Sequence, residues 1–173
     1  IGRSKFPELV FGLNLNGEYK GFDIQLFFQG AGLTTYGYTG FLAHPYSEGK
    51  GSTLFEHHIN NTWTPENRDA EFPRLYYGGN PNNNYTSSFW QRDGSYLRLK
   101  NIEIGYDFKK YLLKNVAMIQ GLRLFASAQN LFTISAIKYM DPELRTDNAT
   151  DAGMDGSAYP QMKNYTLGVN ITF

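Results

Sequence analysis

Three histidines could bind a metal ion or exchange protons near neutral pH, because imidazole does both in proteins. They are His44, His57 and His58, and the last two are adjacent. A zinc site normally takes four ligands from cysteine, histidine and acidic residues, often at fixed spacings. The chain has no cysteine and no pair of histidines one helical turn apart. We therefore expect no metal site and interpret the three histidines as solvated loop residues.

Acidic and nucleophilic residues give no clearer pattern. Asp147, Asp151 and Asp155 could suggest calcium, but their spacing does not match the twelve-residue EF-hand loop. We therefore expect a solvated acidic loop. No serine has a histidine and an acid at a recognisable spacing, and no pair of carboxylates stands out. The sequence predicts that the protein is not an enzyme and carries no cofactor.

Aromatic and charged side chains in the long segment 30–94 are better candidates for a binding function. Tyrosine and tryptophan rings stack on sugar or peptide groups, while arginine and aspartate orient polar ligands. The alternative is that these residues pack the loops together or lie at a membrane interface. The candidate substrate-binding residues are Trp63, Arg68, Asp69, Tyr76, Tyr77, Trp90 and Arg92.

Strands must position these loops, and the clearest strand is the last stretch, 165–173. Its residues alternate between an apolar face and a small or polar face, with an aromatic residue at each end of the apolar face. This length and pattern are typical of a membrane-spanning strand. A half-buried edge strand of a soluble sandwich has the same period. The proposed lipid-facing and barrel-assembly residues are Tyr165, Leu167, Val169, Ile171 and Phe173.

Four earlier segments show a similar alternation, which predicts antiparallel strands over 11–19, 22–29, 96–108 and 121–133. The first two flank Lys20-Gly21, a pair suited to a tight hairpin turn. The other connections are 30–94, 109–120 and 134–161. Because strand direction alternates, both long connections fall on one side of the sheet and both short ones on the other. That sorting is typical of outer-membrane barrels, which have long extracellular loops and short periplasmic turns.

Three local features are less regular. In an unbroken strand, Leu97 and Leu99 would point to the opposite face from Ile102 and Ile104, because they occupy odd rather than even positions. Either a β-bulge near Lys100-Asn101 restores the register, or the two leucines face inward against another part of the protein. Phe125 and Leu131 interrupt the polar face of their strand. The tract 78–84 reads as irregular or mobile, and a single helical turn is expected in 111–114.

Composition excludes several classes of protein. The 16 basic and 16 acidic residues balance, and no basic cluster could neutralise a row of phosphates, so nucleic acid is not an expected partner. The first residues have no pattern of a signal peptide, and we expect the chain to begin downstream of one. The smallest outer-membrane barrels need about eight strands. We therefore expect these five strands to be the C-terminal portion of a larger all-β protein.

Several short motifs resemble one family, the SusC/RagA-like TonB-dependent outer-membrane transporters of Bacteroidetes. They occur in the family's order and span nearly the whole chain. The motifs are Phe11-Gly12-Leu13-Asn14, Tyr19-Lys20-Gly21-Phe22-Asp23, Phe28-Gln29-Gly30, Ser95-Tyr96-Leu97-Arg98-Leu99-Lys100-Asn101 with Gly105-Tyr106, Gln129-Asn130-Leu131-Phe132-Thr133, Asp141-Pro142-Glu143, and Tyr159-Pro160 before a strand that ends in Phe173.

The resemblance implies that residues 1–173 are the C-terminal part of a plugged barrel of roughly 22 strands in the outer membrane. It implies import of glycan or peptide oligomers with a SusD-like surface lipoprotein, and energy supplied through TonB. The plug, the TonB box and the signal peptide would lie outside this chain. Two alternatives remain open: a soluble, aromatic-rich β-sandwich that binds carbohydrate, and a siderophore-type TonB-dependent receptor.

Overall fold

A computed structural model describes residues 2–46, 54–144, 153–154 and 161–173, which form two compact units. One unit, here called the sheet unit, comprises 9–32, 96–135 and 161–173. The other, here called the loop unit, comprises the described residues of 1–8, 33–95 and 136–160. Within the described residues, no helix is long and apolar enough to cross a membrane.

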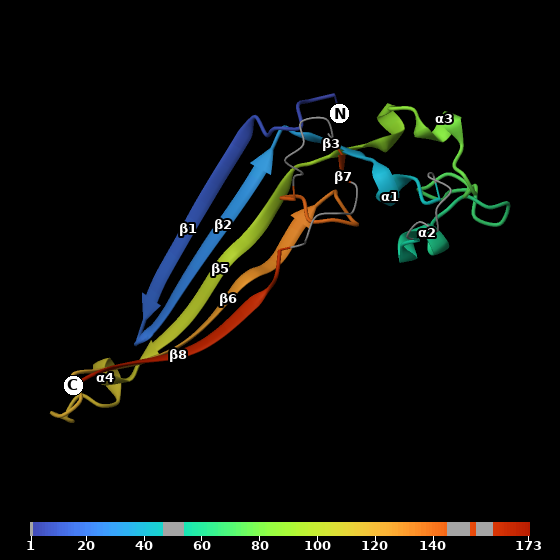
Figure 1. The fold of residues 1–173 in the computed structure, drawn as a ribbon. Helices are drawn as coiled ribbons and strands as arrows, with labels where there is room; N and C mark the ends of the chain where they lie inside the picture. Colours follow the sequence, from blue (N-terminus) through green and yellow to red (C-terminus); the bar gives the residue numbers. More distant parts are fainter. Residues whose placement is uncertain (1, 47–53, 145–152, 155–160) are drawn as a thin grey trace. The chain divides into compact units, whose positions relative to one another are not determined.

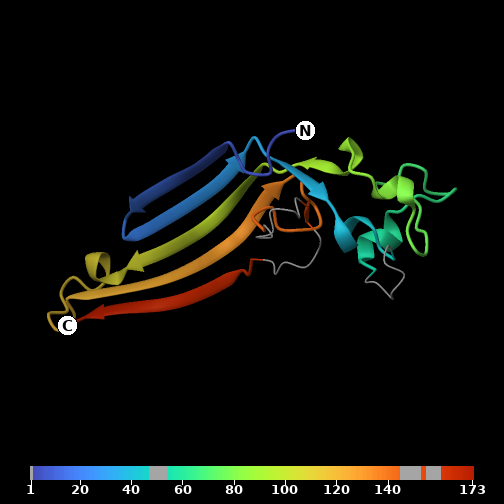
Figure 2. The same ribbon diagram turned by 45° about the horizontal axis from the view of Figure 1, so that its top comes forward.

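The sheet unit is one antiparallel sheet of five long strands in the order β1-β2-β5-β6-β8. Figures 1 and 2 show the five strands side by side. They match the five predicted strands, and three begin or end a few residues beyond the predicted bounds. The strands are β1 (Leu9–Tyr19), β2 (Phe22–Gly32), β5 (Tyr96–Asp107), β6 (Gly121–Ser135) and β8 (Asn164–Thr172).

Cross-strand pairing places most apolar residues of the five strands on one face. Ile24 of β2 pairs with Ile104 of β5, which pairs with Ala126 of β6, which pairs with Leu167 of β8. Residues that pair directly point to the same side of a sheet. Many of these side chains are exposed, and Leu167 reaches 86%. The sheet therefore presents a broad, exposed apolar face, which is the arrangement that the alternating pattern predicts.

A bulge explains why the apolar residues of β5 change from odd to even positions along the strand. Leu99 pairs with Phe28 and Asn101 pairs with Phe27, so Lys100 is an extra residue on β5. On the other side, Leu99 pairs with Phe132 of β6. The extra residue returns Leu99 to the face that carries Phe28, as a bulge does. The bulge prediction is confirmed.

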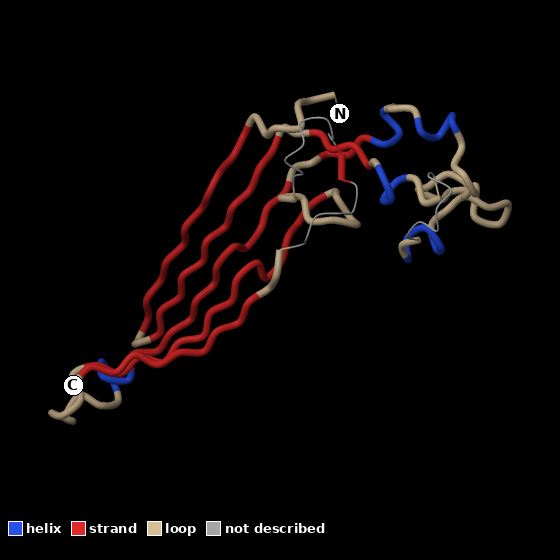
Figure 3. The backbone as a smooth tube through the Cα atoms, in the orientation of Figure 1, coloured by secondary structure: helices blue, strands red, loops and turns tan. Residues whose placement is uncertain are grey.

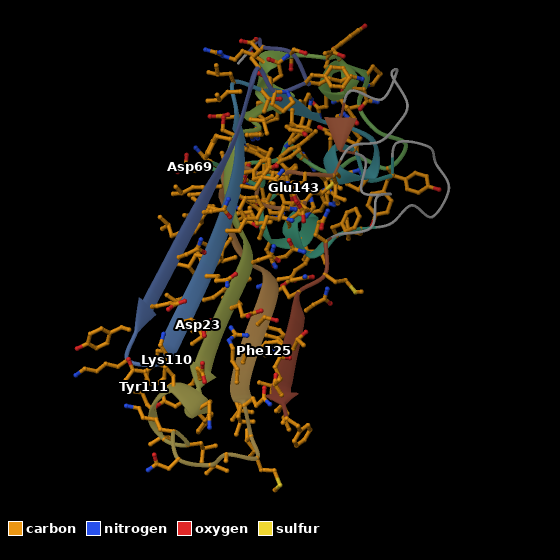
Figure 4. All side chains as sticks on the ribbon, turned by 90° about the vertical axis from the view of Figure 1, so that its left-hand side faces the viewer. Asp23, Asp69, Lys110, Tyr111, Phe125 and Glu143 are labelled. Atoms are coloured by element: carbon orange, nitrogen blue, oxygen red, sulfur yellow. The ribbon has the colours of Figure 1, made fainter. Side chains whose placement is uncertain are left out.

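Large side chains on the polar face lie over glycines of the neighbouring strand. The Phe125 ring of β6 lies across Gly168 of β8, its pairing partner, and the Arg123 guanidinium lies across Gly105 of β5. A glycine leaves a gap in the row of side chains, and an aromatic ring from the next strand can fill it. Phe125 therefore interrupts the polar pattern because it fills the gap above Gly168. Figure 4 labels Phe125 on its strand.

Replacing Gly168 with alanine is expected to destabilise the folded receptor by about 1–3 kcal/mol, the usual cost of overpacking. A Cβ atom at this position would overlap the Phe125 ring, so the ring must move from its place. The free energy of folding into lipid vesicles measures the effect. The double variant Gly168→Ala/Phe125→Ala should recover part of the loss, and full additivity of the two substitutions would contradict the packing explanation.

Short connections close one end of the sheet. Lys20 and Gly21 have φ of 48° and 89°, and positive φ at both central residues is the signature of a type I′ hairpin turn. The helix α4 (Phe108–Tyr111) follows β5 directly and begins three residues earlier than the predicted turn at 111–114. Its start is set by the Asp107 side chain, which accepts a hydrogen bond from the Lys110 amide at 3.2 Å. Lys110 and Tyr111 are labelled beside this turn in Figure 4.

The loop unit has secondary structure and a core of its own. Figure 3 shows short helices and strands in this part of the chain. The elements are β3 (Thr35–Tyr38), α1 (Gly40–Ala43), α2 (Glu56–Asn60), α3 (Pro81–Asn84), the 3₁₀ turn η1 (Ser88–Trp90), β4 (Gln91–Asp93) and β7 (Gly153–Met154). The strands pair in the order β4-β3-β7. The buried core consists of Tyr36, Tyr38, Leu42, Ala43, Phe72, Trp90 and Ile137.

Part of the tract that the sequence predicts to be irregular is the helix α3. Asn80 caps it, with its side-chain oxygen accepting a hydrogen bond from the Asn82 amide at 3.0 Å, and Pro81 occupies the first helical position. Both are preferred at a helix start. The prediction of an irregular tract is wrong at 81–84, because Asn80 and Pro81 start a helix there.

Candidate functional site

The histidines are packed into the loop unit, so their interpretation as solvated residues was wrong. His58 is 0% exposed. Its Nε2 donates a hydrogen bond to the Leu42 carbonyl at 2.7 Å, and its Nδ1 accepts one from the Phe55 amide at 3.2 Å. These partners require the neutral Nε2–H tautomer. Burial lowers the pKa of His58 to about 4, so the ring is neutral at pH 7.

The two other histidines are also held by rings. His57 stacks on Tyr139 with centroids 4.2 Å apart, and its Nε2 lies 3.2 Å from the same Leu42 carbonyl. His44 meets the Trp90 ring edge-on at 4.7 Å. Burial lowers the pKa of both histidines. Adjacent aromatic residues bury the imidazoles because the loop unit, despite its polar sequence, closes around its own aromatic core.

Glu71 is the polar centre of the loop unit. Its carboxylate accepts hydrogen bonds from the Tyr139 hydroxyl at 2.8 Å and from Lys138 Nζ at 3.2 Å, and Arg92 Nη2 lies 3.4 Å away. Burial acts to raise the pKa of Glu71, but the hydrogen bonds and the two cations outweigh it and lower the pKa overall. The network joins residues 71, 92 and 138–139, which are distant in sequence. No local pattern marks Glu71, so sequence reasoning missed it.

Two of the seven candidate substrate-binding residues lie inside this packed region. Trp90 is 5% exposed, and its Nε1 donates a hydrogen bond to the Asn83 carbonyl at 2.8 Å. Arg92 lies over the Tyr38 ring at 5.0 Å and pairs with Glu71. In this arrangement both residues hold the loop unit together, as the packing alternative in the sequence analysis describes.

The other five candidates are accessible or partly accessible at the surface. Tyr77 is 81% exposed, Tyr76 is 44% exposed and Trp63 is 37% exposed. Arg68 Nε donates a hydrogen bond to the Pro65 carbonyl at 3.2 Å, and Asp69 is labelled in Figure 4. These side chains could meet a ligand without rearrangement of the core.

The acidic run Asp147, Asp151 and Asp155 lies outside the described residues. Among the residues that the structure describes, no group of three metal-ligating side chains converges.

The polar face of the sheet unit carries amide, hydroxyl and charged groups in rows across the strands. Asn16 pairs with Gln25, which pairs with Glu103, which pairs with Ser127. These residues line a shallow hollow together with Phe27 and Asn101. Such a surface offers many hydrogen-bonding groups to water, to a polar ligand or to another protein segment.

An ion cluster crosses three strands of the same face. Arg123 of β6 donates to Asp23 of β2 at 2.5 and 3.0 Å and to Glu103 of β5 at 2.7 Å. The Asp23, Glu103 and Arg123 side chains are 18, 31 and 25% exposed. Bidentate arginine–carboxylate pairs fix geometry as well as adding energy. The cluster therefore ties β2, β5 and β6 together on the polar face.

No family model matches the chain, but comparison with known proteins finds relatives that are named TonB-dependent receptors. TonB-dependent receptor P3 of Formosa agariphila is 33% identical over 96% of this chain and 16% of its own length. TonB-dependent receptor SusC of Bacteroides thetaiotaomicron is 31% identical over 96% of this chain and 15% of its own length. The chain thus spans about a sixth of these curated relatives.

Solved structures show the same fold. A structure described as the RagAB peptide importer in the "open-open" state aligns over 100% of this chain with a TM-score of 0.70 and 25% identity. A second, described as the RagAB peptide transporter, aligns with a TM-score of 0.69 and 23% identity. This chain covers 18% of each of those chains. With its five-stranded sheet, its sequence motifs and these relatives, the chain belongs to the SusC/RagA-like family of TonB-dependent receptors.

Proposed function

We propose that this chain supplies the C-terminal strands of a plugged β-barrel of roughly 22 strands, in an outer-membrane receptor that imports nutrient oligomers with energy from TonB. The observation that carries the proposal is the five-stranded sheet with one exposed apolar face and one polar face, in a chain of this family. The apolar face suits lipid and the polar face suits the barrel interior. The plug, the TonB box and the signal peptide would belong to other parts of the receptor.

The connections support a direction for the strands. Strands β2 and β6 end, and β5 and β8 begin, at the end of the sheet that carries the long segments, as the register of Ala31, Tyr96 and Ser135 indicates. Long loops face outward in barrels of this kind. The chain ends that lead from β2 to β5 and from β6 to β8 would therefore face the outside of the cell, and the Lys20-Gly21 turn and the connection from β5 to β6 would face the periplasm. The last strand would meet lipid and the assembly machinery through Tyr165, Leu167, Val169, Ile171 and Phe173.

The partners follow from the family. We infer that a SusD-like surface lipoprotein covers the receptor from outside, that TonB engages it from the periplasm, and that the remaining barrel strands, the plug and outer-membrane lipid surround this segment. RagAB and SusC among the relatives support the pairing with a lipoprotein. Trp63, Arg68, Asp69, Tyr76 and Tyr77 are the side chains that we propose to contact the substrate or the lipoprotein. Nucleic acid is not among the proposed partners.

The soluble carbohydrate-binding sandwich is less well supported. A sandwich buries the apolar face of one sheet against a second sheet. In this chain Tyr165 and Leu167 of that face are 70 and 86% exposed. The three relatives TonB-dependent receptor P3, SusC and TonB-dependent receptor P26 favour the barrel instead.

Uptake measurements test the proposed function. Cells that lack the receptor gene should lose uptake of one class of labelled oligomer, either oligosaccharide or peptide, and regain it with the intact gene. A tagged receptor should sediment with outer membranes and carry a lipoprotein with it. Uptake of ferric chelates alone would instead indicate the siderophore-type receptor, and a tagged protein in the soluble fraction would exclude the barrel.

A further inference from the structure

The loop unit contains a cavity of about 320 Å³. It lies between the N-terminal segment, β3 and the turn that follows α3. This volume is in the range of small-ligand sites. Its lining combines cations, hydroxyl groups and aromatic rings, of which Arg3, Lys5, Thr35, Tyr85, Ser87 and Trp90 matter here.

Hydrogen bonds with two buried threonines fix the backbone that carries the two basic lining residues, Arg3 and Lys5. The Arg3 amide donates to Thr35 Oγ1 at 3.1 Å, and the Thr35 amide donates to the Ser4 carbonyl at 3.1 Å. The Thr34 hydroxyl lies 3.1 Å from the Ser4 carbonyl and 3.0 Å from the Lys5 carbonyl. Thr34 and Thr35 are 2 and 7% exposed. The backbone that carries Arg3 and Lys5 is therefore fixed to the start of β3.

Two other lining residues, Trp90 and Tyr85, are aromatic. Trp90 is held by its hydrogen bond to Asn83 and by the edge contact with His44. Burial lowers the pKa of His44, which leaves its ring neutral at pH 7. Tyr85 is also part of the lining and is 68% exposed. The lining therefore offers aromatic surface as well as cations.

Arg3 and Lys5 are the only charged groups among the described residues of the lining. Two acids lie near Arg3 outside it. Glu8 is 3.6 Å away, but both side chains of this pair are about half exposed, and such surface pairs contribute little. Asp93 is held chiefly by hydrogen bonds from Ser95, with a smaller influence from Arg3. The cavity therefore favours an anionic group that also has an apolar or hydroxyl-bearing face.

We propose that this cavity binds a carboxylate carried by the imported oligomer, with Arg3 and Lys5 opposite the charge and Tyr85 against the neighbouring residue or ring. The proposal rests on the proposed function of the receptor. A uronic acid of a glycan and an acidic side chain of a peptide present the same group, so the experiment must separate these two sources.

The experiment uses the purified full-length receptor and measures binding by calorimetry. The probes are a uronic acid trisaccharide, the same trisaccharide with its carboxylates reduced to alcohols, triglutamate and triglutamine. We expect one of the acidic probes to bind at least about tenfold more tightly than its neutral counterpart, as a charge-assisted contact would allow. The difference should shrink as salt is raised.

Three variants test the assignment to this cavity. Arg3→Gln should remove most of the preference for the acidic probe. Glu8→Gln should strengthen binding by about two- to threefold, because it removes a competing carboxylate from Arg3. Lys20→Gln makes the same change of charge as Arg3→Gln, but in the hairpin turn of the sheet unit, and should have no effect. Opposite shifts in Arg3→Gln and Glu8→Gln cannot arise from a general loss of folding.

The outcomes separate the two proposals. If neutral probes bind as well as acidic ones, the carboxylate site is wrong while the import function stands. If the preference exists but survives Arg3→Gln, the anion binds elsewhere and the cavity assignment is wrong. If none of the four probes binds, the inference fails, and the uptake measurement decides separately whether the proposed function fails too.

Discussion

Replacing Val169 with arginine is expected to destabilise the folded receptor by about 2–4 kcal/mol, the cost of a cation near the middle of the bilayer on the lipid face. Val169 lies in the central part of β8, pairs with Leu124 and is 52% exposed. Its row continues through Tyr106 to Phe22, so the whole row is apolar. Among the described residues of that row, an arginine would have no charged partner. The free energy of folding into lipid vesicles, obtained from denaturant titrations, measures the loss.

Thr166→Arg is the matched control for this prediction. Thr166 is on the same strand but the opposite face, where it pairs with Ser127 in the row that contains Glu103. An arginine at this position would lie on the polar face with Ser127 directly across from it, and a cost below about 1 kcal/mol is expected. If Val169→Arg and Thr166→Arg cost the same, the assignment of the apolar face to lipid is wrong.

The sheet could be predicted from the sequence because its signal is local. Alternation in 165–173 fixes which residues share a face, and Lys20-Gly21 fixes one hairpin without knowledge of distant residues. The bulge could be located to within a residue, since Leu99 and Ile102 cannot share a face otherwise. The choice between a bulge and inward leucines required the pairing of Leu99 with Phe28, which is a long-range fact.

The loop unit could not be predicted in the same way. Its core joins Tyr38, Phe72, Trp90 and Ile137, which are separated by tens of residues and follow no period. The interpretation of the histidines as solvated residues is wrong for the same reason. Burial of His58 depends on the Leu42 carbonyl and on the aromatic rings around it rather than on its neighbours in sequence. Trp90 is a conspicuous candidate in sequence and a packing residue in space. Exposure, which separates Tyr77 from Trp90, is a property of the fold.

The buried state of His58 leads to the second large expectation, a loss of loop-unit stability in mild acid. An unfolded histidine has a pKa near 6.5, and the pKa of His58 in the fold is about 4. Between these two pKa values the unfolded state binds more protons than the folded state. The stability that neutral His58 contributes is therefore fully present above the pKa of the unfolded state, and it is lost as the pH falls toward the pKa of the folded state. The loss should be about 2 kcal/mol between pH 7 and pH 5 and about 3 kcal/mol by pH 4. The pKa of His57 and His44 is lowered too, which adds loss of the same sign.

Hydrogen exchange in the full-length receptor measures this loss at the backbone amides of α2, where His58 N–H donates to the Phe55 carbonyl and Asn61 N–H donates to the His57 carbonyl. Their free energy of opening should fall between pH 7 and pH 5 after correction for the intrinsic exchange rate. In His58→Gln the glutamine side chain can still donate a hydrogen bond toward Leu42, but it does not titrate. The free energy of opening should therefore be lower than in the unchanged receptor at pH 7 and should change much less with pH. His44→Gln is the comparison, since His44 meets only the edge of Trp90 and its loss should leave most of the pH dependence in place. An unchanged pH dependence in His58→Gln would show that another group controls the opening of the loop unit.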